Sequence, residues 1–352
     1  MALSKIDVAN MVENQMPQAN VADNVNFRNI IINGDMSVSQ RSTSASSITS
    51  SGYHSIDRFQ TSASSIGTWT QSQSTDVPTG QGFAKSLKMD CTSADASPAA
   101  SDNLIIIQKF EGQNLQYLKK GTSSAEQLTL SFWVKSNKTG TYIAGLHDRD
   151  NSRIVSKSYT ISSADTWEKK TITFPADTTG AFDNDNAGSL DIQMWLAAGS
   201  DFSGGTLATT WQSQTNANRA VGQVNLADST SNEWYITGVQ LEAGTTASDF
   251  EFLPVDVNRE RCLRYFIDLL YIGASGYATG ANQTARARTT IVYPVHMRAS
   301  PTRNVTNNSG SNVHSDSAFA SSANEMGGLY TRKSAASGGL YWSADLELDA
   351  EL

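Results

Sequence analysis

Two carboxylates in the segment FDNDNAGS, Asp183 and Asp185, come closest in spacing to a catalytic or metal-binding pair. A glycoside hydrolase needs two carboxyl groups about 5 to 9.5 Å apart. Together with Asp177, the same loop offers hard oxygen ligands of the kind that Ca²⁺ prefers, but it lacks the full spacing of a calcium loop. The Asn- and Gly-rich setting favours a turn whose side chains cap the backbone. We therefore expect no catalytic residue and no cofactor, with Ca²⁺ at these three residues as the alternative.

Other catalytic and redox motifs are missing from the sequence. It contains no GxSxG, HExxH, GxxxxGK[ST] or CxxC pattern, and its four histidines are isolated from one another. The two cysteines, Cys91 and Cys262, are far apart and lack metal-ligand spacing. Buried free thiols are favoured over a disulfide. The pattern therefore predicts a protein that is not an enzyme.

Aromatic residues beside polar neighbours are the side chains best suited to binding a ligand. Sugars present flat apolar faces and hydroxyl groups, so they suit an exposed ring flanked by Asn, Asp, Gln or Arg. The candidates in the larger part of the chain are Trp69, Trp133 and Trp195, and those near its end are Tyr330, Arg332, Tyr341 and Trp342. The alternative is that these rings pack in a core, under loops or between subunits.

The elements that position these residues are predicted to be β-strands. Apolar runs of strand length alternate with Gly, Asn, Asp and Ser clusters, as in LIIIQKF, LTLSFWVKS, KKTITF, LDIQMWLAA and WYITGVQLE. In LTLSFWVK, one strand face carries Leu128, Leu130, Phe132 and Val134. Trp133 falls on the opposite face, as Trp195 does with Gln193 in LDIQMWLAA. This alternation predicts an all-β chain built around a β-sandwich.

The chain divides into three parts by pattern. Residues 1–26 form a leader with one short helical stretch, which is either disordered or an attachment segment that orders on a partner. Residues 27–257 are expected to form the large sandwich. Residues 258–352 are expected to form a smaller β-sandwich at the tip.

Composition excludes two classes of partner. Of the 352 residues 17% are charged, and the formal net charge is -8, so no basic surface for a phosphate backbone is expected and nucleic acid is excluded as a partner. No stretch is apolar enough for a signal peptide or a membrane helix. We expect a soluble chain without membrane insertion.

Several segments in order resemble a family of bacteriophage tail fibre proteins, many of them from phages of marine bacteria and cyanobacteria. The segments include RNIIINGDMSVSQR, YHSIDRFQ, IIIQKFEGQNL, LTLSFWVKSNKTGTY, ITGVQLEAGTTASDFEFLP and ERCLRYF, and the resemblance covers most of residues 27–266. Residues 303–352 resemble nothing that we can place. The resemblance implies a jelly roll similar to carbohydrate-binding modules within residues 27–257.

The resemblance also implies a place and partners for the protein. It implies a homotrimer in the virion tail, made in the host cytoplasm without a signal peptide. The N-terminus would attach to another tail protein, such as an adaptor, nozzle or baseplate component. The outward parts would bind host surface polysaccharide or lipopolysaccharide.

Two other functions stay open from the sequence. A polysaccharide-depolymerising tailspike, a glycoside hydrolase, would need a cleft with paired carboxylates. A purely architectural tail component would bind no ligand. We expect a tail fibre that mediates attachment through carbohydrate.

Overall fold

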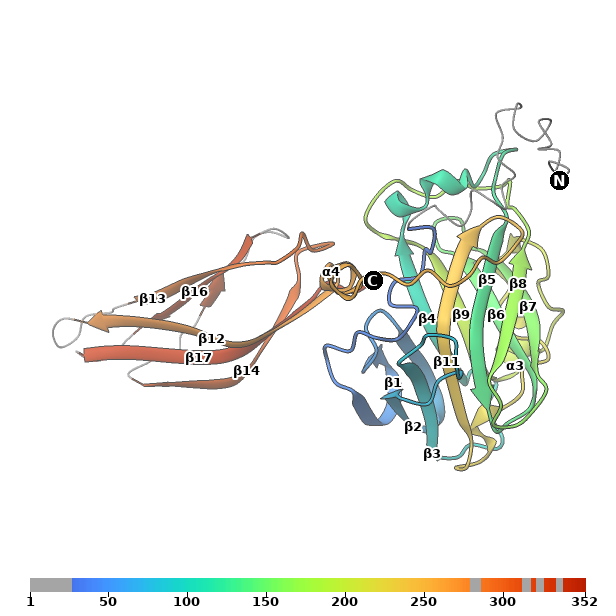
Figure 1. Ribbon diagram of the computed structural model, residues 1–352, viewed down its shortest axis with the longest axis horizontal. Coiled ribbons are helices and arrows are strands. Elements are labelled where there is room, and N and C mark those ends of the chain that lie inside the picture. The colour runs from blue at the N-terminus through green and yellow to red at the C-terminus, as the bar shows by residue number, and fades with distance from the viewer. Residues whose placement is uncertain (1–26, 279–285, 312–317, 321–325, 334–337) are drawn as a thin grey trace, which may run out of the picture.

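The computed structural model describes residues 27–278, 286–311, 318–320, 326–333 and 338–352, so the expected attachment segment 1–26 lies outside the described residues (Figure 1). The described chain is mostly antiparallel β-structure, as predicted. No helix within the described residues is long and apolar enough to cross a membrane. Cys91 and Cys262 are buried free thiols, which confirms the expectation from the sequence.

The larger part of the chain contains the first eleven strands and several short helices. The strands are β1 (Ser44–Tyr53), β2 (Gln60–Ser74), β3 (Ser86–Ser93), β4 (Asn103–Glu111), β5 (Leu128–Ser136), β6 (Gly140–Asp148), β7 (Arg153–Ile161), β8 (Glu168–Phe174), β9 (Gly188–Ala198), β10 (Gln212–Ser213) and β11 (Glu233–Ala243). The short helices are η2 (Gly112–Asn114), η3 (Gln116–Leu118), α3 (Ser200–Ser203), η4 (Asn216–Asn218) and η5 (Leu226–Asp228).

The pairing order of these strands is that of a jelly roll. One layer runs β3-β11-β5-β8 and the other β4-β9-β6-β7. Taken in chain order, the first of these eight strands pairs with the last, the second with the seventh, and so on inward, which is the nested pairing of the double Greek key. The long strand β2 joins the layers, because its first half pairs with β4 and its second half with β3. It turns between them near Gly67, where a positive φ and the close approach of the Ser93 carbonyl favour glycine.

The core lies between the two layers. The predicted inward face of β5, formed by Leu128, Leu130, Phe132 and Val134, is buried there, which confirms the alternation found in the sequence. Burial of apolar side chains at about 25 cal/mol per Å² drives this packing. Both layers therefore present their outer faces to loops, to other segments or to solvent.

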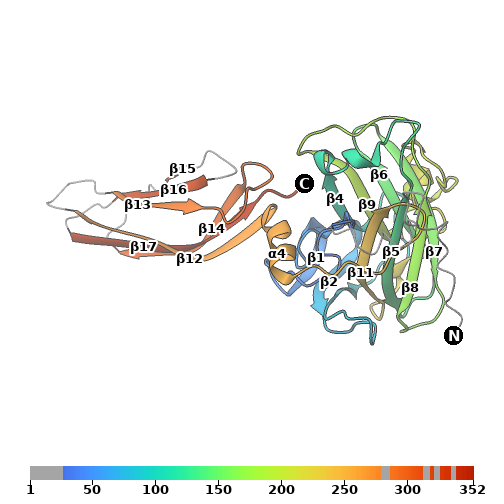
Figure 2. The ribbon, with the colours of Figure 1, turned by 45° about the horizontal axis from the view of Figure 1, so that its top comes forward.

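The chain then continues through one helix into two small sheets. Helix α4 (Val255–Leu263) leads to β12 (Phe266–Ala278), β13 (Arg286–Val292), β14 (Thr302–Ser311), β15 (Ala318–Ala320), β16 (Met326–Lys333) and β17 (Gly338–Asp349). The two sheets have the orders β12-β17-β14 and β13-β16-β15. They project from one side of the jelly roll (Figures 1 and 2). The boundary expected at residue 258 falls inside α4.

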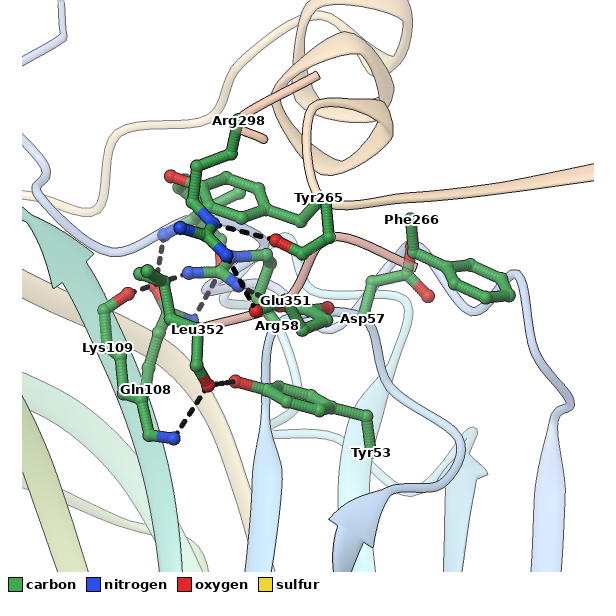
Figure 3. Close-up of polar contacts among 12 residues, drawn as sticks. Tyr53, Asp57, Arg58, Gln108, Lys109, Tyr265, Phe266, Arg298, Glu351 and Leu352 are labelled. Atoms are coloured by element: carbon green, nitrogen blue, oxygen red, sulfur yellow. Dashed lines mark hydrogen bonds and ion pairs between the residues drawn. The ribbon is translucent and has the colours of Figure 1, made fainter. Parts of the chain in front are cut away.

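A buried ion pair joins the projecting sheets to the jelly roll (Figure 3). Arg58, between β1 and β2, is 0% exposed and pairs with Glu351, whose side chain is 4% exposed. The same guanidinium donates to the carbonyl of Lys109 at 2.7 Å and lies 3.4 Å from the ring centroid of Tyr265. Charge, hydrogen bonding and stacking therefore hold the end of the chain on the jelly roll.

Further contacts fix the four residues 349–352. Arg41 donates to Asp349 at 3.0 Å, with its guanidinium stacked on Phe266. The Leu352 carbonyl accepts from Lys109 at 2.6 Å and from the Tyr53 hydroxyl at 3.2 Å (Figure 3). The strand β17 is thereby anchored just beyond its last residue.

Glu111, at the end of β4, makes a further charged contact between the two parts. Arg264 donates to both carboxylate oxygens, at 2.8 and 2.6 Å, and the Tyr265 hydroxyl donates at 2.6 Å. Burial opposes ionisation of this carboxyl, but these hydrogen bonds outweigh it and lower the pKa of Glu111.

The first prediction concerns Glu351→Gln. It leaves the Arg58 guanidinium buried without its counter-charge, so we expect a loss of about 3–5 kcal/mol in the free energy of unfolding. Denaturant unfolding measures it. The double variant Arg58→Met with Glu351→Leu should regain most of the loss, because a buried pair replaced by apolar groups is often neutral.

A matched control for that experiment is Glu126→Gln, which removes the exposed ion pair with Lys119. Exposed pairs contribute about 1 kcal/mol or less. An equal cost for Glu126→Gln and Glu351→Gln would contradict the role given to the buried pair.

The second prediction is a pH dependence from Glu111. Because its folded-state pKa lies below the unfolded value of about 4.3, its contribution to stability is complete above that value. The contribution is lost as the pH falls through the folded-state pKa. Thermal unfolding is measured between about pH 7 and pH 3. The Tm of Glu111→Gln should be lower than that of the wild type at pH 7, and it should fall less steeply as the pH is lowered. Parallel curves for the two proteins would contradict this.

Candidate carbohydrate-binding surface

Two of the predicted sugar-binding tryptophans are buried. Trp69 is 0% exposed in the jelly-roll core, and its indole donates to the Ile66 carbonyl at 2.7 Å. Trp195 is also 0% exposed. It lies on the outer face of β9, as the alternation predicts, but residues 199–225 cover that face and pack Phe202 at 5.4 Å between ring centroids. Neither indole can stack on a sugar in this structure, and both expectations are corrected.

The three candidate calcium ligands are not brought together. Asp177 is buried and accepts two hydrogen bonds from Arg153, at 2.7 and 2.9 Å, while Lys120 lies 3.0 Å away. Asp183 and Asp185 are exposed, and Asp185 accepts from the backbone of Ala187 at 2.9 Å, the cap that a turn provides. Within the described residues no group of three His, Cys, Asp or Glu is arranged to hold a metal ion.

The candidates near the end of the chain lie on strands of the projecting sheets. Tyr330 and Arg332 are in β16 and Trp342 is in β17, with side chains outside the described part of the structure. Tyr341, also in β17, is 46% exposed. A role in sugar binding for these four residues stays a prediction.

Trp133 is partly exposed on the outer face of the β3-β11-β5-β8 layer, and two other rings lie beside Lys135, two residues further along the same face of β5. Lys135 of β5 is opposite Tyr235 of β11, and Trp133 is opposite Lys169 of β8. Trp167 precedes β8, with its ring centroid 6.2 Å from that of Tyr235. The Lys135 ammonium lies 4.5 Å from the Tyr235 ring centroid. We call Trp133, Trp167, Tyr235 and Lys135 the sheet-face patch.

Carboxylates at the edge of the sheet-face patch orient its rings and amines. Asp76 accepts from the Trp167 indole at 2.9 Å and from Lys135. Burial disfavours the charged form of Asp76, but those hydrogen bonds outweigh it and lower the pKa. Glu233 accepts from the Tyr235 hydroxyl and from Lys88, both at 2.6 Å. Burial is again outweighed by these contacts, so the pKa of Glu233 is lowered.

One carboxyl beside the patch behaves differently. Burial raises the pKa of Asp90, with Lys88 opposing the shift and Glu233 adding to it. The Lys88 ammonium lies 3.7 Å from Asp90 and 2.6 Å from Glu233. A carboxyl pair with pKa values moved in opposite directions is the pattern of an acid and a base, so this pair bears on the hydrolase alternative.

The arrangement can bind a polyhydroxyl ligand. Aromatic edges supply apolar contact, and ionised carboxylates and ammonium groups accept and donate hydrogen bonds to hydroxyls. Sequence reasoning selected Trp133 but missed Trp167, Tyr235 and Asp76. For Tyr235 the signal was present, because alternation in WYITGVQLE places it on the face opposite the buried Trp234. The approach of Asp76 to Trp167 depends on long-range pairing that no local pattern contains.

Comparisons with known proteins find structures but no family. No protein-family model matches the chain, and no curated protein matches its sequence. The enzymatically active domain of tailspike protein 4 of bacteriophage CBA120 is 14% identical, with a TM-score of 0.33, over 61% of this chain and 21% of that chain. A family 61 carbohydrate-binding module solved with β-1,4-galactotriose is 10% identical, with a TM-score of 0.31, over 61% and 99% of the two chains.

A third match is the family 11 carbohydrate-binding module from Clostridium thermocellum, solved with a mixed-linked tetrasaccharide. It is 12% identical, with a TM-score of 0.26, over 58% of this chain and 91% of that chain. TM-scores below 0.5 do not establish a common fold. The assignment of the jelly roll therefore depends on the strand order of the chain itself.

The third prediction separates core from surface tryptophans. Trp69→Ala removes a fully buried ring and should lower the free energy of unfolding by about 3–5 kcal/mol. Trp133→Ala removes a partly exposed ring and should cost about 1 kcal/mol or less. Denaturant unfolding of both variants checks the difference, and a cost for Trp133→Ala as large as that for Trp69→Ala would place Trp133 in the core.

Proposed function

We propose that the chain is a phage tail fibre protein that attaches the virion to carbohydrate on the host surface through the sheet-face patch. The observation that carries the proposal is the patch itself, in which two part-exposed indoles, Trp133 and Trp167, and the buried ring of Tyr235 are held beside ionised carboxylates and ammonium groups on one face of a jelly roll. The ordered resemblance of residues 27–266 to tail fibre proteins supports the place in the virion tail.

The proposed chemistry is weak binding at each site. An aromatic contact contributes about 0.5 to 1.5 kcal/mol, so a few such contacts give roughly millimolar affinity. A homotrimer and several fibres on one particle would raise the effective affinity through multivalency. In this proposal residues 1–26 attach to an adaptor, nozzle or baseplate protein, and the ligand is surface polysaccharide or lipopolysaccharide.

A second candidate function is depolymerisation of that polysaccharide. It is favoured by one arrangement, the carboxyl groups of Asp90 and Glu233 on directly paired residues of β3 and β11 beside the patch, with pKa values shifted in opposite directions. A hydrolase would release reducing ends, and Asp90→Asn would abolish the release. A binding protein would retain the polysaccharide without cleaving it.

The fourth prediction tests the binding surface. Trp133→Ala should reduce retention of the purified chain on polysaccharide extracted from candidate host cells by about tenfold, because 1.4 kcal/mol of lost stacking corresponds to that factor. Retention and reducing sugar are measured together in the wild type, in Trp133→Ala and in Tyr341→Ala.

Four outcomes distinguish the candidates. Loss confined to Trp133→Ala supports the patch, whereas loss confined to Tyr341→Ala moves recognition to the projecting sheets. Steady release of reducing sugar that stops in Asp90→Asn identifies a hydrolase. An absence of retention in the wild type leaves the architectural component as the function.

A further inference from the structure

A pocket of about 360 Å³ lies where α4 meets the jelly roll, away from the residues of the sheet-face patch. Its walls come from the stretch before β1, from the end of β4 with the turns after it, and from α4 with the residues that follow. The volume lies within the usual range for small-ligand pockets, about 300 to 1,000 Å³. Asn29, Asn114, Tyr117 and Arg261 are among the residues that line it.

Arg261 is a half-buried cation in this pocket, and none of the carboxylates in the described ranges pairs with it. Within the described residues no carboxylate oxygen forms an ion pair with its guanidinium, which donates to the Asn29 carbonyl at 3.3 Å. The acid that acts on it electrostatically, Glu251, instead accepts from the backbone amides of Phe27 and Asn29. A charge removed from water usually has a partner, so this arrangement favours an anion.

Three other arginines near the junction each have a carboxylate partner. Arg264, one helical turn along and lining the same pocket, holds Glu111 with two hydrogen bonds. Arg58 pairs with Glu351, and Arg41 pairs with Asp349. The carboxylate of Glu111 is thus already neutralised, and Arg261 is left to set the charge of the pocket.

Two exposed rings form the apolar part of the pocket. Tyr117 is 49% exposed and Phe27 is 61% exposed, although exposing such large apolar side chains to water costs free energy. Asn114 adds an amide that can donate and accept hydrogen bonds. A cation, an amide and open aromatic faces together suit a ring that carries both hydroxyls and an acidic group.

We propose that this pocket binds a sugar unit bearing a carboxylate or a phosphate, with the acidic group paired to Arg261 and the sugar ring against Tyr117. The proposal rests on the proposed carbohydrate recognition and adds a second site, selective for acidic units. Arg suits both anions because its planar fork of donors matches a carboxylate or a phosphate. A neutral sugar would leave the guanidinium without a counter-charge.

The test, which is the fifth prediction, uses the full chain and three probes: trigalacturonic acid for the carboxylate, glucose 6-phosphate for the phosphate, and maltotriose as the neutral sugar. Calorimetry or ligand-observed NMR gives each dissociation constant. We expect the wild type to bind at least one acidic probe, and Arg261→Ala to weaken that binding tenfold or more. Arg261→Lys should recover part of it, since the charge is kept and the fork is lost.

Two variants serve as controls. Arg259→Ala removes an exposed arginine of the same helix that does not line the pocket, and should leave binding of the acidic probe unchanged. Tyr117→Ala removes an exposed ring and should weaken binding of the acidic probe while the chain stays folded. Thermal unfolding of Arg261→Ala should show an unchanged or higher Tm, because a half-buried cation with no carboxylate partner among the described residues does not stabilise the fold.

Several results would overturn the proposal. The first is that neither acidic probe binds. The second is that Arg261→Ala and the wild type bind the acidic probe equally well. The third is that Arg261→Ala has a lower Tm but binds the probe as before, which would make the role of Arg261 structural. Retention of host polysaccharide that is lost in Trp133→Ala but unaffected in Arg261→Ala would leave the proposed function standing and remove this pocket from it.

Discussion

The buried pair of Arg58 and Glu351 is the interaction on which the rest of the arrangement depends. It fixes the residues just after β17 on the jelly roll (Figure 3). Arg264 and Tyr265, just before β12, are fixed on Glu111. Since β12 and β17 are paired neighbours, the sheet is held at the base of both strands. The same contacts place α4 against the jelly roll, and the pocket at Arg261 exists because α4 is held there.

The distribution of partners separates structural charges from those available to ligands. Arg58 and Arg264 have carboxylate partners at the junction. Lys135 has one within the sheet-face patch, and Lys88 has one beside it. Charged groups that are already paired gain little from a further ionic partner. The patch therefore suits a neutral ligand that is recognised through its hydroxyl groups and its shape. Arg261 has no such partner within the described residues, so its pocket is the place where an anion lowers an electrostatic cost.

Local alternation predicted much of the fold but only part of the site. It placed Trp133 on the outer face of β5 and Trp195 on the outer face of β9 correctly, because side-chain direction has a period of two. It could not predict that residues 199–225 cover Trp195. Trp69 shares its face with Gln71, and that polar neighbour suggested exposure. The Gln71 amide is instead satisfied internally by Ser55 and Thr61, so Gln71 is buried beside Trp69.

The jelly roll and the junction serve recognition in different ways. In a sheet, rows of side chains from strands far apart in sequence lie side by side, so Tyr235 and Trp167 meet across β5 without any local signal. Strands β11 and β5, which carry Tyr235, Trp133 and Lys135, are each paired on both sides, so that part of the surface is fixed by the sheet itself. The pocket instead depends on how one helix docks, so its geometry depends on the ion pairs at the junction. A change that loosens Glu111 or Glu351 therefore acts on the pocket at Arg261 before it acts on the sheet-face patch.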